Sequence, residues 1–451
     1  MAKAKTAYVC SSCGATFLGW LGKCPQCGEW NTLVRRPVEG REERRRPRSV
    51  GRVVSLANVL DEEEARIPVP VDEVSRVLGG GFVPGSVVLL AGAPGIGKST
   101  LVLQICMCLA REGRPVLYIS GEESARQIGM RAKRLIESPP ELHIFAEPAV
   151  EAMIEEVGSL EPALVVVDSI QSVYLESRSS MAGSITQVRD SAAALSRMAK
   201  ETGIPLVLVG HVTKAGAIAG PRVLEHMVDV VLYMEGDRFH AHRLLRSVKN
   251  RYGSTNEVGV FEMTQTGLRQ VSNPSEAFLA ERLIGVSGSA VAVTMEGTRP
   301  ILVEVQALTS QALYGNVRRT ANGFDYRRLL LITAVLSRRA GIALGQQDVF
   351  VNVVGGMQLN EPAADMGVAM AIASSALDRP LPADMAFVGE VGLSGEVRSV
   401  AQLERRVAEA ARLGFAKCMV PRSYGKSWRN GEECEVLPVR TVAEGVRLLR
   451  G

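Results

Sequence analysis

The sequence has 451 residues, of which 46% are hydrophobic and 22% are charged, a composition typical of a soluble globular chain with two to four domains. Its formal net charge of +4 is small, so any nucleic-acid-binding surface has to be local. We see no apolar run of the ~18–20 residues that span a bilayer and no signal peptide, and therefore expect a cytoplasmic protein without a membrane partner, whose eight cysteines do not form disulfides.

Four cysteines near the amino end form two closely spaced pairs. Two residues separate Cys10 from Cys13 and Cys24 from Cys27, and a glycine directly follows each pair. This spacing predicts two tight turns whose four thiolates surround one Zn²⁺ ion in a closed, structural site. A segment of this size buries too little core to fold unaided, so zinc would stabilise a finger over residues 1–33. The alternative is a redox-active pair or thiols that bind no metal.

Two features of the first 54 residues suit contacts with nucleic acid but also have a plainer explanation. Trp20 and Trp30 could stack on bases or on a partner, or could pack over the zinc site. Residues 34–54 are rich in arginine, proline and glutamate, with three consecutive arginines at 44–46. Such a segment is typical of a flexible, solvated linker, and its basic side chains could also touch phosphates.

A glycine-rich stretch at residues 92–100 fits the phosphate loop G-x-x-x-x-G-K-[ST] of nucleotide hydrolases. We expect its backbone N–H groups to surround the phosphate oxygens of ATP, with Lys98 on the β and γ phosphates and Ser99 on Mg²⁺. An ordinary glycine turn between a strand and a helix is the alternative. The candidate nucleotide-binding residues are Gly92, Ala93, Pro94, Gly95, Ile96, Gly97, Lys98, Ser99 and Thr100.

Strands and helices alternate through a predicted domain of residues 55–272. Continuous apolar strands between helices predict a parallel sheet that is covered on both faces. Asp168 ends one of these strands and is by position the acid that holds Mg²⁺ with Ser99, although it could instead cap the next element. The predicted strands are residues 87–91, 116–120, 142–145, 163–168 and 205–210, and the predicted helices are residues 101–111, 125–137, 150–158 and 184–202.

The strand after the phosphate-loop helix ends in Ser120-Gly121-Glu122-Glu123-Ser124, and here the chain resembles the RecA-like ATPases. The resemblance implies a glutamate that polarises the attacking water. The register of the strand places Glu122 in this role, with Glu123 as second choice. Either glutamate could instead only stabilise the first turn of the next helix. It also implies that His211 senses whether the γ phosphate is present and transmits this to a polymer-binding loop at residues 212–223. An ordinary buried histidine and a surface loop are the alternative.

The motif Lys249-Asn250-Arg251-Tyr252-Gly253 follows this core. Together with the four-cysteine finger, it resembles the signature of the bacterial RadA/Sms family of DNA repair and recombination proteins, in which phenylalanine usually stands at the position of Tyr252. The resemblance implies that Lys249 and Arg251 reach the nucleotide of a neighbouring subunit, where an arginine can contact the transition-state oxygens. By composition alone, a basic surface turn would look the same.

Residues 273–451 resemble the Lon protease domain, most clearly at residues 367–370 and 389–395. Two departures decide what we expect of it. Asp365 stands at the position of the catalytic serine, and Glu404 at that of the catalytic lysine, with Arg405 one residue away; a carboxylate can replace neither group. The predicted strands are residues 290–296, 300–308 and 349–354, the predicted hairpin is residues 389–398, and the predicted helices are residues 325–341, 362–377 and 402–413. We therefore expect a retained fold without peptidase activity.

A group of arginines in this region suits a basic DNA surface, or simply the solvated start of a helix. They lie near Tyr326 and are Arg318, Arg319, Arg327 and Arg328. Phosphate contacts by such groups would make DNA binding strongly salt-dependent.

The sequence thus predicts an α/β protein in four parts, ordered as a zinc finger (1–33), a basic linker (34–54), a RecA-like ATPase core (55–272) and an inactive α+β Lon-like domain (273–451). The resemblance implies a helicase-type ring motor, most simply a hexamer, that uses ATP, Mg²⁺ and Zn²⁺. It would bind single-stranded and branched DNA and promote branch migration alongside the RecA recombinase. An ATP-driven protease and a clock-type signalling ATPase without a nucleic-acid role are the rival hypotheses.

Overall fold

The computed structural model describes residues 6–12, 15–17, 19–37, 66–138, 140–211, 221–236, 241–312, 317–423 and 434–450. The chain divides into two compact units, residues 1–63 and 64–451. Among the described residues, none of the helices combines the length and the apolar character that crossing a membrane requires.

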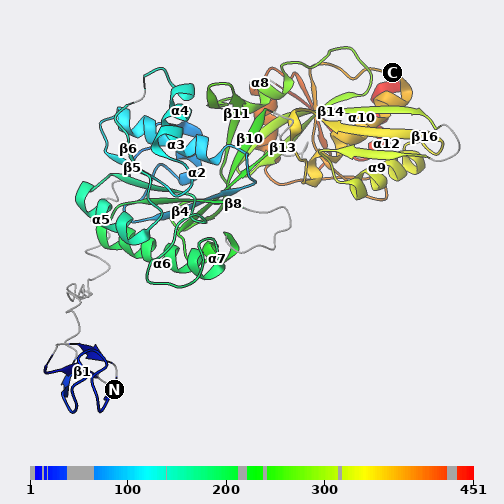
Figure 1. Ribbon diagram of the computed structural model, residues 1–451. Helices are drawn as coiled ribbons and strands as arrows, with labels where there is room; N and C mark the ends of the chain where they lie inside the picture. Colours follow the sequence, from blue (N-terminus) through cyan, green and yellow to red (C-terminus); the bar gives the residue numbers. More distant parts are fainter. Residues whose placement is uncertain are drawn as a thin grey trace, which may run out of the picture. The chain divides into compact units, whose positions relative to one another are not determined.

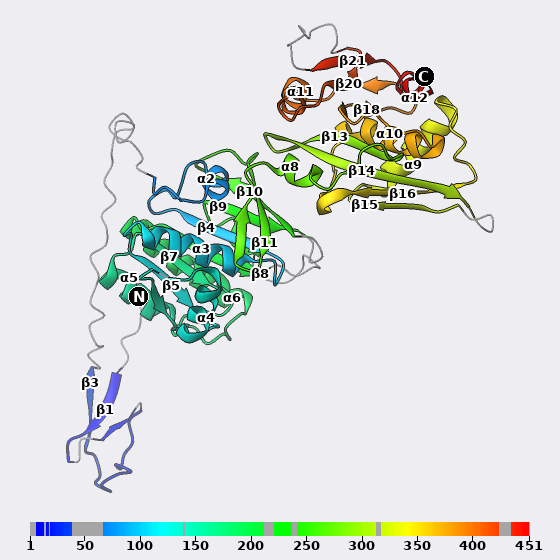
Figure 2. The ribbon, with the colours of Figure 1, turned by 90° about the horizontal axis from the view of Figure 1, so that it is seen from above.

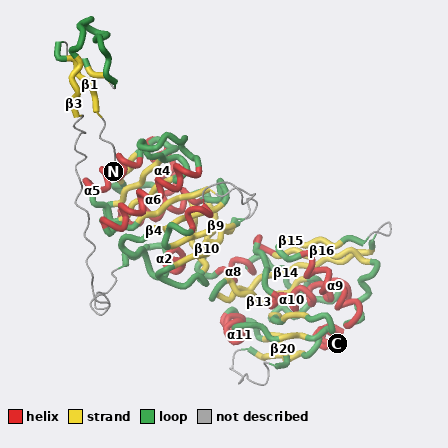
Figure 3. Tube along the Cα trace, turned by 90° about the horizontal axis from the view of Figure 1, so that it is seen from below, coloured by secondary structure: helices red, strands yellow, loops and turns green. Residues whose placement is uncertain are grey.

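The first unit is a small antiparallel sheet with strand order β2-β1-β3, and Figure 3 shows how much of it is loop. Its strands are β1 (Thr6–Cys10), β2 (Thr16–Phe17) and β3 (Leu33–Pro37). The buried apolar cluster of its described part consists of Cys10, Cys24 and Leu33, with Tyr8 and Phe17 packed against them. Such a core is too small to stabilise a fold without a cross-link, as the cysteine spacing predicted.

The second unit begins with a nine-stranded sheet of order β12-β11-β10-β9-β4-β8-β7-β5-β6. Figure 1 shows α3 and α4 on one face of the sheet and α5, α6 and α7 on the other. The strands are β4 (Val87–Gly92), β5 (Val116–Ser120), β6 (His143–Phe145), β7 (Leu164–Asp168), β8 (Leu206–His211), β9 (Val230–Glu235), β10 (His242–Asn250), β11 (Val258–Thr264) and β12 (Gly267–Gln270). The helices are α2 (Asp72–Leu78), α3 (Lys98–Arg111), α4 (Ala125–Leu135), α5 (Val150–Leu160), α6 (Ile185–Thr202) and α7 (Pro221–Glu225).

The parallel part of this sheet confirms the alternation of strands and helices predicted from the sequence. Strands β4, β5 and β7 are buried at every position, because helices cover both faces and leave no polar face to present to water. The antiparallel extension formed by β10, β11 and β12 was not anticipated. These strands are only partly buried and mix apolar with polar residues, so they lack the continuous apolar run that marks the parallel strands.

A second, seven-stranded sheet of order β15-β16-β14-β13-β17-β20-β21 follows (Figure 2). Helices α9, α10 and α12 share one apolar cluster with it, and α11 packs in another. The strands are β13 (Ser289–Glu296), β14 (Arg299–Gln311), β15 (Arg319–Asn322), β16 (Gln347–Val353), β17 (Met385–Phe387), β20 (Lys417–Pro421) and β21 (Glu435–Val439), with the hairpin β18 (Glu390–Val391) and β19 (Val397–Arg398). The helices are α8 (Pro274–Leu279), α9 (Tyr326–Arg339), α10 (Asp365–Leu377), α11 (Leu403–Arg412) and α12 (Val442–Arg450). The predicted hairpin and long helices are therefore present.

Two ion pairs join the nine-stranded sheet and its helices to the seven-stranded sheet. Arg299 on β14 donates through Nη1 to both carboxylate oxygens of buried Glu73 on α2, at 3.0 and 3.1 Å. Arg246 on β10 lies 2.5 Å from Glu296 at the end of β13. Both acids are almost fully buried, so breaking either pair would leave an uncompensated charge in the interior.

The residues that replace the protease dyad have unlike environments. Asp365 is fully buried at the start of α10, where it forms an ion pair with Arg328 and accepts a 3.1 Å hydrogen bond from the backbone N–H of Val391. Glu404, in contrast, is exposed on α11. Asp365 is therefore a structural carboxylate, which gives a physical reason for a charged residue at this position.

We predict that Asp365→Ser will not create peptidase activity and will destabilise the C-terminal half by about 3 kcal/mol, the lower end of the range for breaking a buried ion pair. The lower end applies because the side chain of Arg328 remains 29% exposed and can be partly hydrated. Thermal unfolding and casein degradation with ATP provide the measurements. Glu404→Gln, at an exposed position, is the matched control and should stay within about 0.5 kcal/mol of the parent. An Asp365→Ser protein as stable as the parent would contradict the structural role.

Candidate functional site

The predicted nucleotide-binding residues lie at the ends of four adjacent parallel strands. The register pairs Gly92 of β4 with His211 of β8, and Asp168 of β7 with Val209 of β8 and with Ser120 of β5. Because parallel strands end at the same edge, the phosphate loop, His211, Asp168 and the Glu122 segment meet there. This edge is where ligands bind in open α/β sheets.

The phosphate loop runs from the end of β4 to the first turn of α3, and its glycines are required by their surroundings. A Cβ at Gly92 would lie 2.6 Å from the carbonyl oxygen of Met234. At Gly97 it would lie 2.7 Å from a methyl carbon of Met263, and this residue has a φ of 117°. The loop therefore packs directly on the ends of the neighbouring strands, which fixes its path before any nucleotide binds.

Lys98 is held in a position to meet phosphates. Its Nζ donates hydrogen bonds to the carbonyl oxygens of Gly92 and Ala93, at 2.9 and 3.0 Å, and the residue is only 3% exposed. Burial lowers the pKa of the Lys98 ammonium to about 8, against the opposing influence of Asp168 and Glu122. An incoming phosphate would supply the negative charge that this desolvated cation lacks.

Asp168 and Ser99 supply oxygen ligands of the kind that Mg²⁺ prefers. Asp168 is 9% exposed, and its Oδ2 accepts a 2.5 Å hydrogen bond from the hydroxyl of Tyr118 on β5. Burial raises the pKa of Tyr118, and Asp168 raises it further, so this hydroxyl stays protonated as the donor. Ser99 lies half-buried in the first turn of α3. The donor set fits a magnesium ion, with Tyr118 orienting the carboxylate.

The two glutamates after β5 differ in their partners. Glu122 accepts a 2.6 Å hydrogen bond from the hydroxyl of Ser169, the residue that follows Asp168. Glu123 forms a 2.7 Å ion pair with Arg131 on α4. Glu122 is thus tied to the strand edge of the site, whereas Glu123 is held by the helix.

His211 lies at the same edge, at the end of β8. Burial lowers its pKa, and the positive charge of Lys98 lowers it further, so the neutral imidazole is favoured. Its Nδ1 is buried and has no hydrogen-bond partner among the described residues. The loop expected to receive its signal, residues 212–223, lies outside the described residues up to position 220.

Lys249 and Arg251 lie at the opposite edge of the sheet from the phosphate loop. Arg251 forms a 3.1 Å ion pair with Asp229, whose other oxygen accepts a 3.1 Å hydrogen bond from the N–H of Val87 at the start of β4. Val87 and Gly92, the two ends of β4, are five residue steps apart, a span of roughly 16 Å at ~3.3 Å per residue. Neither side chain can therefore reach the phosphates bound by its own chain.

The two basic residues differ in availability. Lys249 donates to the carbonyl oxygens of Glu225 and Val228, at 2.7 and 2.8 Å, and so fastens the end of α7. The side chain of Arg251 is 57% exposed, although its partner Asp229 is buried. Arg251 is thus the more accessible of the two, and Lys249 has a structural task within its own chain.

Several residues at these two edges were missed by sequence reasoning. The hydroxyl of Tyr118 orients Asp168, and the hydroxyl of Ser169 orients Glu122. Asp229 orients Arg251. Arg243 of β10 donates a 3.2 Å hydrogen bond to the carbonyl oxygen of Ile96 in the phosphate loop. A polar side chain among the apolar residues of β5 was the available signal for Tyr118. No local pattern marks the other three.

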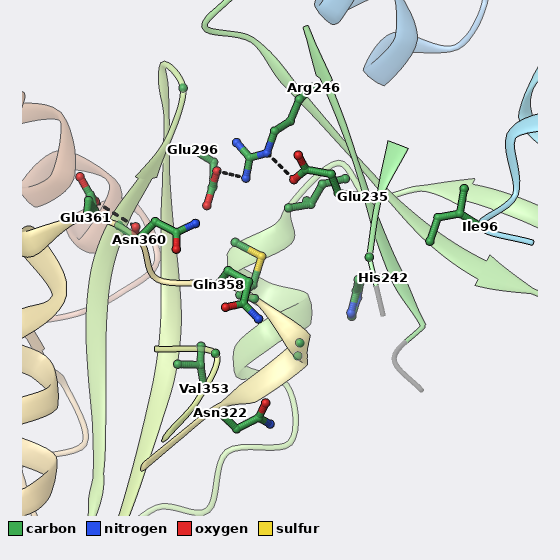
Figure 4. A pocket seen from close by; sticks show the side chains of 18 of the residues that line it. Ile96, Glu235, His242, Arg246, Glu296, Asn322, Val353, Gln358, Asn360 and Glu361 are labelled. Carbon is green, nitrogen blue, oxygen red and sulfur yellow. Dashed lines mark hydrogen bonds and ion pairs between the residues drawn. The ribbon is translucent and has the colours of Figure 1, made fainter. Parts of the chain in front are cut away.

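A cavity of about 1060 Å³ lies behind the phosphate loop, on the side of the seven-stranded sheet. Ala93, Pro94 and Ile96 line one wall, and residues 353–361 line another. Figure 4 shows Arg246 between Glu235 and Glu296, with Glu361 beyond them. The loop that would bind phosphates thus shares a space with the C-terminal half of the chain.

Three of the four predicted zinc ligands lie within the described residues, and the structure brings these three together. One ligand atom from each of Cys10, Cys24 and Cys27 lies within 4.8 Å of the others, and the Sγ atoms of Cys10 and Cys27 are 3.7 Å apart. Four thiolates about 2.3 Å from a tetrahedral zinc would be about 3.8 Å from one another. Cys13 lies outside the described residues, but the three described thiols fit a zinc site.

The four arginines near Tyr326 do not form one uniform basic surface. Arg328 is paired with Asp365, and Arg319 donates to the backbone carbonyls of Leu344 (2.8 Å) and Gln347. Arg318 and Arg327 are exposed. Half of the predicted cluster therefore serves the fold of the C-terminal half.

Comparison with known protein families agrees with the fold. Family models match residues 55–217 (AAA domain), residues 8–35 (rubredoxin metal binding domain) and residues 330–424 (subunit ChlI of Mg-chelatase). With the large parallel sheet, these matches confirm the predicted fold class of a phosphate-loop core between a zinc finger and a Lon-like region.

Proteins named DNA repair protein RadA are similar to this chain over its whole length. Those of Listeria monocytogenes and Bacillus subtilis are each 49% identical to it, over 99% and 100% of both chains respectively. The protein of Halalkalibacterium halodurans is 47% identical over 100% of both chains. The chain belongs to the RadA family of DNA repair proteins.

Proposed function

We propose that this chain is a DNA-dependent ATPase that acts in recombinational DNA repair. The observation that carries the proposal is the arrangement of the nine-stranded sheet, with Lys98, Asp168 and Glu122 at one edge and an exposed Arg251 at the other. One edge has the groups that ATP hydrolysis needs, and the opposite edge has the group that a neighbouring subunit would need.

Each residue at the nucleotide edge has a role that follows from its contacts. Lys98 would neutralise charge on the β and γ phosphates, and Ser99 and Asp168 would hold the Mg²⁺ that bridges them. Glu122, fixed by the hydroxyl of Ser169, would orient the attacking water; we prefer it to Glu123, whose carboxylate is paired with Arg131. His211 would report the presence of the γ phosphate through its unpaired Nδ1.

Arg251 would complete the site of a neighbouring subunit. The length of β4 excludes a role at its own phosphates, and its guanidinium is accessible from outside. We assign Lys249 to positioning, because its two hydrogen bonds hold the end of α7 and the segment that leads from α7 to β9. This arrangement needs a closed ring, for which a hexamer is the simplest proposal.

The family membership supports the cellular role that we propose. The ring would bind single-stranded and branched DNA, move along it as a helicase-type motor and promote branch migration alongside the RecA recombinase. Domains at residues 1–33, 55–272 and 273–451, with a linker at 34–54, would carry zinc binding, ATP hydrolysis and scaffolding. An ATP-driven protease is the second hypothesis, and the buried, ion-paired state of Asp365 argues against it.

The test of the proposal is ATP turnover with and without single-stranded DNA, set beside casein degradation. We expect DNA to stimulate turnover of the parent protein and casein to remain intact. Lys98→Ala should abolish turnover while preserving the fold, because one charge is lost from a loop whose path is set by Gly92 and Gly97. Wild-type turnover by Lys98→Ala would overturn the phosphate-loop assignment, and ATP-dependent loss of casein would favour the protease.

Arg251→Ala should bind ATP normally yet turn it over slowly. Its own site keeps Lys98, Ser99 and Asp168, but its neighbour's site loses the arginine, a loss typically worth about 10³–10⁵ in rate. Arg251→Lys, which keeps the charge without the forked geometry, should recover only part of that rate. Turnover and nucleotide affinity are measured separately to distinguish the two effects.

Mixing Arg251→Ala with Lys98→Ala subunits distinguishes action between subunits from action within one. At interfaces where an Arg251→Ala subunit supplies the intact phosphate loop, a Lys98→Ala neighbour supplies the arginine, so turnover should partly return. Mass photometry with single-stranded DNA checks that mixed rings form. Mixed rings without any turnover would exclude the assignment between subunits.

Cys27→Ser should release zinc and unfold the first ~30 residues, because this small unit has almost no other core. ATP binding should persist, since the phosphate loop belongs to a separate compact unit. Metal analysis and ATP titration are the two measurements. Cys106→Ser, at a buried cysteine of α3 outside the cluster, is the control that should keep its zinc. One zinc retained per Cys27→Ser chain would count against the four-thiolate site.

A further inference from the structure

The zinc-binding unit exposes two tryptophans side by side. Trp20 is 57% exposed and Trp30 is 67% exposed, although large aromatic side chains are usually mostly buried. They are not packed over the metal site, which was the plainer expectation. Leu21, which directly follows Trp20, is also 42% exposed.

Gly22 forms the floor between the two indoles. A Cβ built on Gly22 would lie 3.8 Å from the Cη2 atom of Trp20 and 3.8 Å from the Cζ3 atom of Trp30. These ring atoms are therefore no more than twice that distance apart, and Gly22 has no side chain to fill the space. Both rings thus lie against the backbone of Gly22 and keep exposed surface on which an unpaired base can stack.

The metal site holds this surface in place. Lys23 precedes Cys24 and pairs with Trp30 in an isolated antiparallel bridge, and the N–H of Asn31 donates to the carbonyl of Gly22 at 2.9 Å. The N–H of Cys24 also donates to the carbonyl of Glu29 at 2.9 Å. The two indoles are thus fixed by the same turn that presents the zinc ligands.

The charge of the N-terminal part of the sequence favours a polyanion as the partner. The Nζ of Lys23 lies 5.6 Å from the centre of the Trp30 ring. Residues 1–54 contain 11 lysines and arginines against 4 acidic residues, whereas residues 55–451 contain 41 against 44. The net charge of the first 54 residues stays positive even when a zinc tetrathiolate contributes a charge of −2. The net charge of the rest of the chain is slightly negative.

We propose that Trp20, Trp30 and Lys23 form a binding surface for single-stranded DNA, with bases stacking on the two indoles and a phosphate contacting Lys23. The proposal rests on the DNA-dependent activity proposed above, and it adds a contact on the zinc unit that is separate from the ATPase core. Base stacking on aromatic rings tolerates any sequence, which suits a protein that has to follow a strand. Protein partners also use exposed tryptophans, but they would not require the excess of positive charge.

The test uses the full-length protein with Trp428→Phe, so that Trp20 and Trp30 are the remaining tryptophans of the three in the chain. A fluorescein-labelled oligothymidylate reports binding by anisotropy, while indole emission is followed in parallel with unlabelled strand. We expect quenching of the emission with the same midpoint as the anisotropy change. Substituting leucine for both Trp20 and Trp30 should weaken binding at least about fivefold, and phenylalanine at both positions should retain most of it.

Two controls separate this surface from the rest of the protein. Zinc content of one ion per chain shows that each variant keeps its fold, and leucine preserves apolar bulk while removing the aromatic face. Lys23→Gln should lower the slope of log affinity against log salt by about one unit.

The outcomes distinguish this inference from the proposed function. Two results would overturn the proposed DNA-binding role of this surface: strand binding without quenching of the indole emission, or leucine variants that bind as tightly as the parent. Either result would leave DNA binding by the protein intact and would assign the tryptophans to a protein partner. Failure of the parent protein to bind the strand at all would overturn the proposed function together with this inference.

Discussion

Parallel pairing of β4, β8, β7 and β5 is the constraint on which the nucleotide site depends. It aligns the ends of four apolar strands, so that Lys98, His211, Asp168 and Glu122 become neighbours although they are far apart in the sequence. Their charges then influence one another: Asp168 and Glu122 oppose the effect of burial on Lys98, and Lys98 favours the neutral form of His211. The buried strands make this arrangement stiff, because both faces are covered by helices and slippage would expose apolar surface.

The sequence was most informative where a local pattern is itself the cause of the structure. The phosphate loop, the strand before it and the helix after it depend on adjacent residues, and the fold class could be predicted from them. Local patterns could not separate Glu122 from Glu123, because the distinction lies in Ser169 and Arg131, which belong to other elements. The same reason applies to Lys249 and Arg251, whose partners Glu225 and Asp229 become neighbours only when β9 and β10 pair.

The C-terminal half shows how a fold persists after its catalytic positions change. Position 365 is fully buried, whereas position 404 is exposed on α11. In this chain Asp365 is bound by Arg328 and by the N–H of Val391, and on α11 the buried Arg406 forms two hydrogen bonds with Glu361, at 2.5 and 2.7 Å. Buried charges of this kind are retained only when they are paired, since removal of one partner leaves the other desolvated. Such pairs give Asp365 and Arg406 a structural role in the C-terminal half.

Strand β10 links the regions that the proposed activity has to coordinate. Near its start Arg243 donates to the carbonyl of Ile96 in the phosphate loop; in its middle Arg246 contacts Glu296 of the seven-stranded sheet. Arg251 follows directly after its last residue, at the opposite edge. A register shift between Ser247 and Lys249 changes which face the end of the strand presents, and it lets Lys249 reach the end of α7. Because β10 is paired on both sides, a displacement of the phosphate loop transmitted through Arg243 would also act on the C-terminal half and on Arg251, which we propose to act on the next subunit.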